Sequence, residues 1–285
     1  MTNKYVVTFY SIEKIEDYLK VGRSVERFCK KKNIVGTFFS TLQGINTTLS
    51  GNKIDLEELI EMLEIKFNFK LLMQDSYKHK GLRNKLVFEL KEKGIKDISV
   101  LDAINIVPRH LFMDSGFLDH AYQDKAFPIS SDQTISQPFT VAFQSELLMV
   151  QKSHKILEIG TGSGYQAAIL CQMGAKVYTI ERIKELFRKT SVFLPSINYH
   201  PKKMIYGDGY LGYSEEAPYD SIIVTAGPSE IPKNLINQLK IGGRMVIPVG
   251  NEVQKMKLIV KISNTDYETY DFGDFNFVPM LKNIK

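Results

Sequence analysis

The chain has 285 residues, of which 44% are apolar and 24% charged, and its net charge is +5 with histidine neutral. This balance is typical of a globular protein, long enough for one large domain or for a large and a small one. It argues against a membrane protein, because no apolar run approaches the roughly 18 residues that span a bilayer. It also argues against a nucleic-acid binder, because no Lys/Arg block is interleaved with aromatic residues.

The cysteine content and the first residues indicate which cross-links and which cellular compartment to expect. Cys29 and Cys171 are the only cysteines and lie in different segments, so we expect neither a disulfide framework nor a cysteine-based metal site. The first nine residues lack the apolar stretch of a secretory signal, which favours the cytoplasm. The oligomeric state stays open.

Residues 1–72 have the pattern of a small domain of their own. The predicted elements are a strand at 5–10, a helix at 12–32, strands at 35–40 and 45–49, a helix at 55–64 and a strand at 67–72. The order βαββαβ predicts a ferredoxin-like α+β sandwich. We place the domain boundary after residue 72, with a larger domain over 73–285.

One stretch of this small domain carries a resemblance. Residues 36–51, with Gln43-Gly-Ile-Asn46 at their centre, are similar to the amino-terminal domain of the rhodanese-related tRNA uridine hydroxylases, which usually have Glu-Gly-Ile-Asn there. That family's chemistry belongs to a following rhodanese domain with a cysteine nucleophile, which this chain lacks. The resemblance therefore implies a fold and no activity. Gly44 and Asn46 are interpreted as hairpin turn residues.

The segment between the small domain and the first glycine-rich motif is mixed. A polar linker at 75–84 runs into a helix up to Lys93, and a second helix, capped by Asp97 or Ser99, stops before Pro108. His110 stands beside apolar residues and is interpreted as a structural histidine. Residues 120–140 are predicted to be an irregular loop before a helix at 141–150, and such loops are often functional.

The strongest local motif is a glycine loop. A buried strand at 156–159 is followed by Gly160, Gly162 and Gly164, and then by a helix at 165–173. Glycines allow tight turns and let the backbone approach a ligand closely. The spacing G-x-G-x-G differs from the dinucleotide motif G-x-G-x-x-G. With Glu158 before the loop, it resembles motif I of the S-adenosylmethionine-dependent methyltransferases.

Strands and helices alternate after this loop. Strands are predicted at 176–180, 203–206, 219–226 and 244–248 with helices at 183–191 and 232–239, and two last strands at 256–262 and 267–272 are expected to be antiparallel. Strands separated by helices predict an α/β, Rossmann-like doubly wound sheet.

Acidic residues end three of the strands. Glu181 lies at the offset from Gly160 at which an acid accepts both ribose hydroxyls of a nucleoside cofactor. Asp208, followed by Gly209, is expected near the adenine amino group, and Glu158 near the amino-acid part of the cofactor. Glu181 argues against a nicotinamide 2′-phosphate. No lysine follows the glycines, which excludes a P-loop.

Several blocks together give a narrower resemblance. They are Thr134-Ile-Ser-Gln-Pro138, the glycine loop over 157–166, Gly207-Asp-Gly209 and Ile222-Ile-Val-Thr-Ala226, with further blocks at 107–112, 242–250 and 277–279. Over residues 75–281 the chain resembles protein-L-isoaspartate O-methyltransferase. The resemblance implies S-adenosyl-L-methionine as the cofactor, no metal, and damaged proteins with L-isoaspartyl residues as partners. It also implies repair, in which the methyl ester closes to a succinimide that hydrolyses in part to normal aspartate.

The same resemblance assigns substrate-side residues. Ser136 matches the family's active-site serine, and Ile135, Val278 and Pro279 are expected to line the substrate. A carboxylate substrate is ionised at pH 7, since its usual pKa is about 3.5–4. The reaction therefore needs orientation rather than a general base, and Ser136 is expected to orient the carboxylate.

Two alternatives are weighed against this enzyme. The first is a catalytically silent S-adenosylmethionine-binding module that docks on RNA or protein, although such a module has no reason to retain the Ser136 loop. The second is a methyltransferase of another substrate class. Nucleic-acid amino-methylating enzymes usually carry Asn/Asp-Pro-Pro-Tyr/Phe after the fourth strand, where this chain has Thr225-Ala-Gly-Pro228.

Overall fold

The computed structural model describes residues 5–11, 15–67, 72–73, 75 and 77–285. The chain forms two units, Met1–His79 and Lys80–Lys285. The boundary that we predict after residue 72 falls slightly before the division between these units. In the part of the chain that the structure describes, no helix combines the length and the apolar character needed to cross a membrane.

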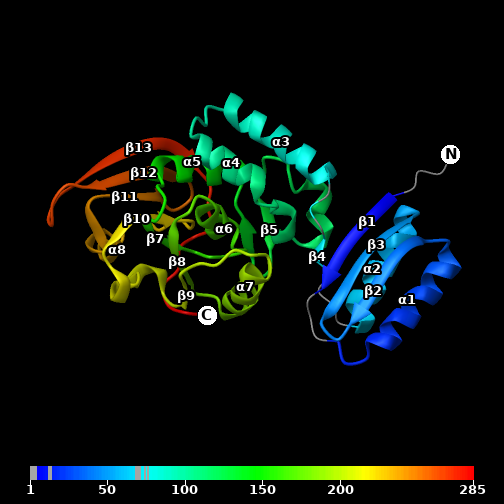
Figure 1. Ribbon diagram of the computed structural model, residues 1–285. Coiled ribbons are helices and arrows are strands. Elements are labelled where there is room, and N and C mark those ends of the chain that lie inside the picture. The colour runs from blue at the N-terminus through cyan, green and yellow to red at the C-terminus, as the bar shows by residue number, and fades with distance from the viewer. Residues whose placement is uncertain (1–4, 12–14, 68–71, 74, 76) are drawn as a thin grey trace. The chain divides into compact units, whose positions relative to one another are not determined.

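The first unit is a four-stranded antiparallel sheet with two helices. Its elements are β1 (Tyr5–Ser11), α1 (Tyr18–Lys32), β2 (Val35–Thr41), β3 (Gly44–Gly51), α2 (Lys53–Phe67) and β4 (Leu72–Met73), with strand order β2-β3-β1-β4 (Figure 1). The two helices and β3 share one buried apolar cluster, which includes Val25 of α1, Leu59 of α2 and Leu49 of β3. The order βαββαβ confirms the predicted ferredoxin-like arrangement.

Local details of this unit differ from the prediction. The helix expected from residue 12 starts at Tyr18, because Asp17 caps it by accepting the N–H of Lys20 at 3.1 Å; residues 12–14 lie outside the described residues. Asn46 is not a turn residue, since it pairs with Phe39 inside the β2–β3 ladder. A strand is expected over residues 67–72, but Phe67 is the last residue of α2. Residues 68–71 also lie outside the described residues.

The second unit is a seven-stranded sheet with helices on both faces (Figure 1). Its helices are α3 (Tyr77–Glu92), α4 (Ile98–Ile106), α5 (Pro138–Leu148), α6 (Tyr165–Gln172), α7 (Lys184–Ser196) and α8 (Lys233–Asn237). Its strands are β7 (Lys155–Ile159), β8 (Lys176–Glu181), β9 (Lys203–Tyr206), β10 (Tyr219–Val224), β11 (Leu239–Val249), β12 (Gln254–Lys261) and β13 (Tyr267–Phe275). The order β13-β12-β11-β10-β7-β8-β9 confirms the predicted doubly wound sheet, with β12 and β13 antiparallel.

The order of the strands reverses between β7 and β10. The chain runs outward from β7 through β8 to β9 and then returns to place β10 on the other side of β7. Ile159 pairs with Ile180 in β8 and with Val224 in β10, so these three strands end side by side. In open α/β sheets, ligands bind outside the carboxyl ends of the strands at this reversal.

The segment before α5 is more ordered than predicted. Residues 120–140 contain a short hairpin, β5 (Phe127–Ile129) and β6 (Gln133–Ile135), whose turn holds Ser131 and Asp132 at positive φ. The helix α5 then begins at Pro138, because a proline is well suited to the first helical turn. Two three-residue strands are too short to give an alternating pattern in the sequence.

Candidate active site

A cavity of about 230 Å³ opens at the carboxyl ends of β7, β8 and β10. Four segments line it, namely residues 132–136, the glycine loop, residues 180–183 and residues 278–281, together with Gly209 and Thr225. Of the predicted site residues, the cavity brings together Ile135, Ser136, Gly160, Gly162, Glu181, Gly209, Val278 and Pro279. Glu158, Gly164 and Asp208 do not line it.

The glycine loop needs its left-handed backbone. Gly160, Gly162 and Gly164 have φ values of +97°, +53° and +87°, which L-residues with a Cβ rarely adopt. A Cβ on Gly160 would lie 2.5 Å from Oγ1 of Thr225, whose hydroxyl donates to the Gly160 carbonyl oxygen at 2.8 Å. The loop after β7 is therefore held against the end of β10.

Gly164 has a packing role in place of the expected cofactor contact. A Cβ there would lie 2.8 Å from a methyl carbon of Thr190 and 3.0 Å from one of Leu194, both on α7. The missing side chain lets the start of α6 approach that helix. The effect of Gly164 on the cavity is thus indirect.

Glu181 forms part of the cavity wall and is only 4% exposed. Its Oε2 accepts the N–H of Gly162 at 2.9 Å, and its Oε1 accepts the N–H of Ile183 at 2.8 Å. A carboxylate oxygen has a second lone pair, so both oxygens retain capacity for a ligand hydroxyl. These two acceptor oxygens fit the hydroxyl groups at the ribose end of a nucleoside cofactor.

Glu158 lies beneath the loop and is fully buried. Thr179 donates its hydroxyl to Oε2 of Glu158 at 2.5 Å, and Thr161 lies 2.6 Å from the Thr179 hydroxyl. Burial raises the pKa of Glu158 to about 8, so the side chain is mostly protonated at neutral pH. Since Thr161 lines the cavity and Glu158 does not, Glu158 acts on the site through the two threonines.

Asp208 is also used within the protein. Its Oδ1 accepts the N–H of Tyr210 at 2.8 Å, and its Oδ2 accepts the N–H of Asn283 at 2.7 Å. The carboxylate thus fastens the last residues of the chain to the end of β9. Its neighbour Gly209 does reach the cavity, where a Cβ would lie 2.4 Å from Ile159.

The substrate-side residues lie on two segments. Ile135 ends β6, and Ser136 follows it before α5. The Ser136 hydroxyl makes no hydrogen bond to any residue within the described ranges, so it is not tied to the backbone of its loop. Val278 accepts the N–H of Gly227 at 2.8 Å through its carbonyl oxygen, and Pro279 bridges to Gly227, so these two residues are held beside the loop after β10.

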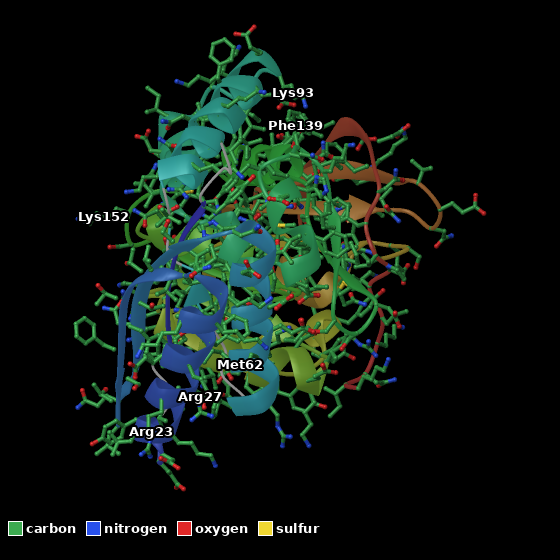
Figure 2. The ribbon with its side chains drawn as sticks, turned by 90° about the vertical axis from the view of Figure 1, so that its right-hand side faces the viewer. Arg23, Arg27, Met62, Lys93, Phe139 and Lys152 are labelled. Atoms are coloured by element: carbon green, nitrogen blue, oxygen red, sulfur yellow. The ribbon has the colours of Figure 1, made fainter. Side chains whose placement is uncertain are left out.

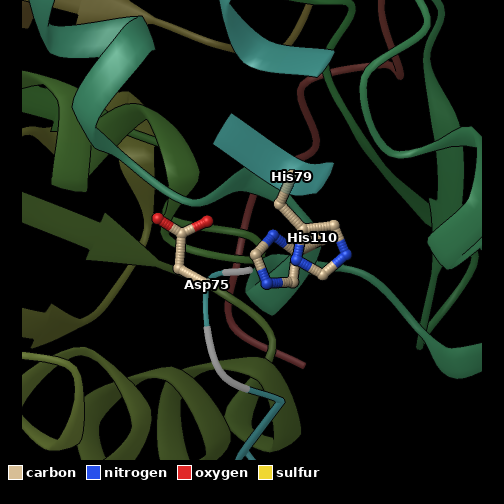
Figure 3. Close-up of side chains that lie close together, drawn as sticks. All are labelled: Asp75, His79 and His110. Atoms are coloured by element: carbon tan, nitrogen blue, oxygen red, sulfur yellow. The ribbon is translucent and has the colours of Figure 1, made fainter. Parts of the chain in front are cut away.

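His110 takes no part in this cavity. The side chain, which Figure 3 draws as sticks, is 1% exposed. Its Nδ1 lies 2.6 Å from the Tyr122 hydroxyl. This environment agrees with its interpretation as a structural histidine. Thr161 and Thr225 also lie in the cavity wall. They were not predicted as site residues, because a single threonine after a strand gives no signal of its own.

A glycine loop at the reversal of a doubly wound sheet, with a buried acid at the end of the next strand, defines a nucleoside-cofactor enzyme of the S-adenosylmethionine-dependent methyltransferase class. Residues 81–285 match the family model of protein-L-isoaspartate(D-aspartate) O-methyltransferase. The chain belongs to this family. Residues 5–93 match a UPF0176 acylphosphatase-like domain, which confirms the predicted resemblance of the first unit.

Individual relatives agree. The protein-L-isoaspartate O-methyltransferases of Christiangramia forsetii and Flavobacterium johnsoniae are each 60% identical over 211 residues, which cover 74% of this chain and 99% of each relative. A solved Plasmodium falciparum protein-L-isoaspartate O-methyltransferase in complex with S-adenosyl-L-homocysteine is 26% identical, with a TM-score of 0.62, over 72% of this chain and 99% of that one. These comparisons confirm the predicted family, enzyme class and S-adenosyl cofactor.

Proposed function

We propose that this chain repairs damaged proteins by transferring a methyl group to the α-carboxylate of L-isoaspartyl residues. Family membership supports the reaction. The observation that carries the site assignment concerns Ser136. It lines the same cavity as the glycine loop, and its hydroxyl has no hydrogen-bond partner in the described parts of the chain. The cytoplasm is the proposed location.

The glycine loop and Glu181 form the side of the cavity that binds the cofactor. S-adenosyl-L-methionine, when bound, supplies a methyl group carried on a positively charged sulfur. The carboxylate of Glu181 accepts the ribose hydroxyls, while Gly160 and Gly162 let the backbone come close to the ligand. Gly209 leaves room beside Ile159 at the adenine end.

Ser136 and its neighbours form the side of the cavity that binds the substrate. When bound, the cofactor would supply its methyl group to one carboxylate oxygen, and its sulfur would keep the two electrons of the carbon–sulfur bond. No proton moves in this step, because the carboxylate is already ionised at neutral pH. Ser136 donates a hydrogen bond to the other carboxylate oxygen, and Ile135, Val278 and Pro279 exclude water around it. Orientation of this kind supplies roughly 7–11 kcal/mol of barrier reduction.

The test is transfer of labelled methyl groups to an isoaspartyl peptide, with the matched aspartyl peptide and tRNA as alternative acceptors. We expect transfer to the isoaspartyl peptide alone. Ser136→Ala should lower kcat with little change in cofactor affinity. The matched control is Ser131→Ala, in the β5–β6 turn of the same segment and outside the cavity wall. Cofactor binding without transfer to any acceptor would favour the silent binding module.

A further inference from the structure

Arg109 is fully buried and holds three separate stretches of backbone. Its Nε donates to the carbonyl oxygen of Ala121, its Nη2 to that of Lys125, and its Nη1 to that of Ser136, each at 2.9 Å. A guanidinium is planar and its N–H groups diverge in fixed directions, so three such bonds fix the positions of three carbonyl groups relative to one another. One of these carbonyl groups belongs to the proposed active-site serine.

The same guanidinium also contacts the cofactor side of the cavity. Its central carbon lies 5.2 Å from the ring centroid of Tyr165, within the range of a cation–π contact. Tyr165 is the first residue of α6 and directly follows Gly164. Arg109 therefore contacts both the residue that follows the glycine loop and the backbone of Ser136, and both of these residues line the cavity.

Asp124 binds two residues that follow Ser136 in the chain, Gln137 and Phe139. Its Oδ1 accepts the N–H of Phe139 at 2.7 Å, its Oδ2 accepts an N–H of the Gln137 side chain at 3.1 Å, and Lys93 pairs with it at 2.6 Å. Two of these partners, Lys93 and Phe139, are labelled in Figure 2. The Asp124 side chain is only 3% exposed. Burial lowers the pKa of Arg109 to about 10, and the charge of Asp124 offsets part of this effect. Ser136 is thus anchored by its own carbonyl and by the residues that follow it.

We propose that Arg109 is a positioning residue for methyl transfer, which sets the Ser136 hydroxyl at its working distance from the cofactor. The proposal rests on the role of Ser136 under Proposed function. Another buried arginine shows why these contacts are specific. Arg83 donates to the Asn105 carbonyl oxygen and to the Tyr122 hydroxyl, and neither of these two partners lines the cavity.

The test is a double-mutant cycle between Arg109→Lys and Ser136→Ala, read as kcat for an isoaspartyl peptide. Lysine keeps the charge and has no planar fork. Misplacement of a reacting group by about 1 Å lowers rates by up to about 100-fold, so we expect Arg109→Lys to lower kcat at least about tenfold in the wild-type background. In the Ser136→Ala background, where the hydroxyl is gone, the loss should fall to about twofold or less.

Controls separate positioning from general damage to the fold. Arg244→Lys alters an arginine that donates to the Leu147 carbonyl oxygen away from the cavity, and it should leave kcat unchanged in both backgrounds. Cofactor affinity of Arg109→Lys, measured by calorimetry, should stay within about threefold of wild type, because the direct cofactor contacts are untouched. If Arg109→Lys does not fold, Asp124→Asn, which weakens the same anchor with little change of shape, takes its place in the cycle.

Equal losses of kcat in the two backgrounds would overturn the proposal, since a purely structural defect acts whether or not the hydroxyl is present. A wild-type enzyme that does not methylate isoaspartyl peptide would refute the proposed function instead, and the two failures are therefore distinguishable.

Discussion

The carboxylate of Glu181 accepts the backbone N–H of Gly162 at 2.9 Å, so the residue that ends β8 holds the middle glycine of the loop that follows β7. One side chain thus shapes the cofactor loop and also forms part of the cavity wall. This double use makes Glu181 more sensitive to substitution than an acid that contacts the ligand alone.

We expect Glu181→Gln to weaken cofactor binding by roughly 1.5–3 kcal/mol for each charge-assisted hydrogen bond lost. In the variant, an amide nitrogen replaces one carboxylate oxygen and faces the N–H of either Gly162 or Ile183. Both groups are donors, so that hydrogen bond is lost as well. Calorimetric titration with S-adenosyl-L-homocysteine measures the change. Glu185→Gln, on α7 and outside the cavity wall, is the control. Unchanged affinity in a folded Glu181→Gln protein would remove Glu181 from the cofactor site.

Glu158 predicts a pH dependence of stability. Burial raises the pKa of Glu158 to about 8 in the folded protein, whereas a glutamate in the unfolded chain titrates near 4.3. The folded state therefore binds the proton of Glu158 more tightly than the unfolded chain does. The stabilisation that results from this proton is fully present below about pH 4.3 and is lost progressively up to about pH 8.

Glu158→Gln mimics the protonated form and removes this dependence. The free energy of unfolding of the variant, minus that of wild type, should rise by up to about 1.4 kcal/mol per pH unit between about pH 4.3 and 8 and then level off. Urea denaturation at a series of pH values checks this. A difference that stays constant with pH would show that Glu158 is not buried in its protonated form.

Gly164→Ala should destabilise the fold more than an ordinary glycine substitution. Its φ of +87° strains any Cβ, and the new atom would lie within 3.0 Å of both Thr190 and Leu194. Left-handed strain and overpacking together should lower the free energy of unfolding by about 2–4 kcal/mol. Gly242→Ala is the matched control, because Gly242 has a φ of +79° with no atom within 4 Å of the Cβ position. Equal effects of the two substitutions would mean that α7 yields easily.

Residues 73–285 should fold and methylate isoaspartyl peptide at a rate near that of the full chain. The relatives from Christiangramia forsetii and Flavobacterium johnsoniae are matched over 99% of their length by 211 residues of this chain, and the second unit has its own buried core around β7, β8 and β10. Comparison of kcat and of the thermal midpoint for the two proteins tests this. An insoluble or inactive 73–285 fragment would show that the boundary is wrong.

The sequence predicts those features that depend on local order along the chain. Gly160, Gly162 and Glu181 follow directly from the ends of two parallel strands, and such ends meet at one edge of a sheet. Ser136 was predicted only through the family resemblance of its loop, since a single serine in an irregular segment has no pattern of its own.

Features that depend on tertiary contacts could not be predicted. An arginine in a sequence is expected to be solvated, and the three carbonyl groups that bind Arg109 follow 12 to 27 residues later in loops without regular spacing. Glu158 and Asp208 were expected near the cofactor at the ends of two strands, and neither of them lines the cavity. The sequence gives the end of a strand but not the face toward which its last side chains point.

The outer strand β13 has a consequence for how the protein behaves at high concentration. It lies at the end of the strand order, and an edge strand offers unpaired backbone groups to any second strand that approaches. Asp271 and Asp274 stand exposed on it, paired with Lys257 and Lys255 of β12. These charges make edge-to-edge pairing of two molecules unfavourable. Neutral residues at these positions would therefore promote fibrous aggregation through the exposed edge of β13.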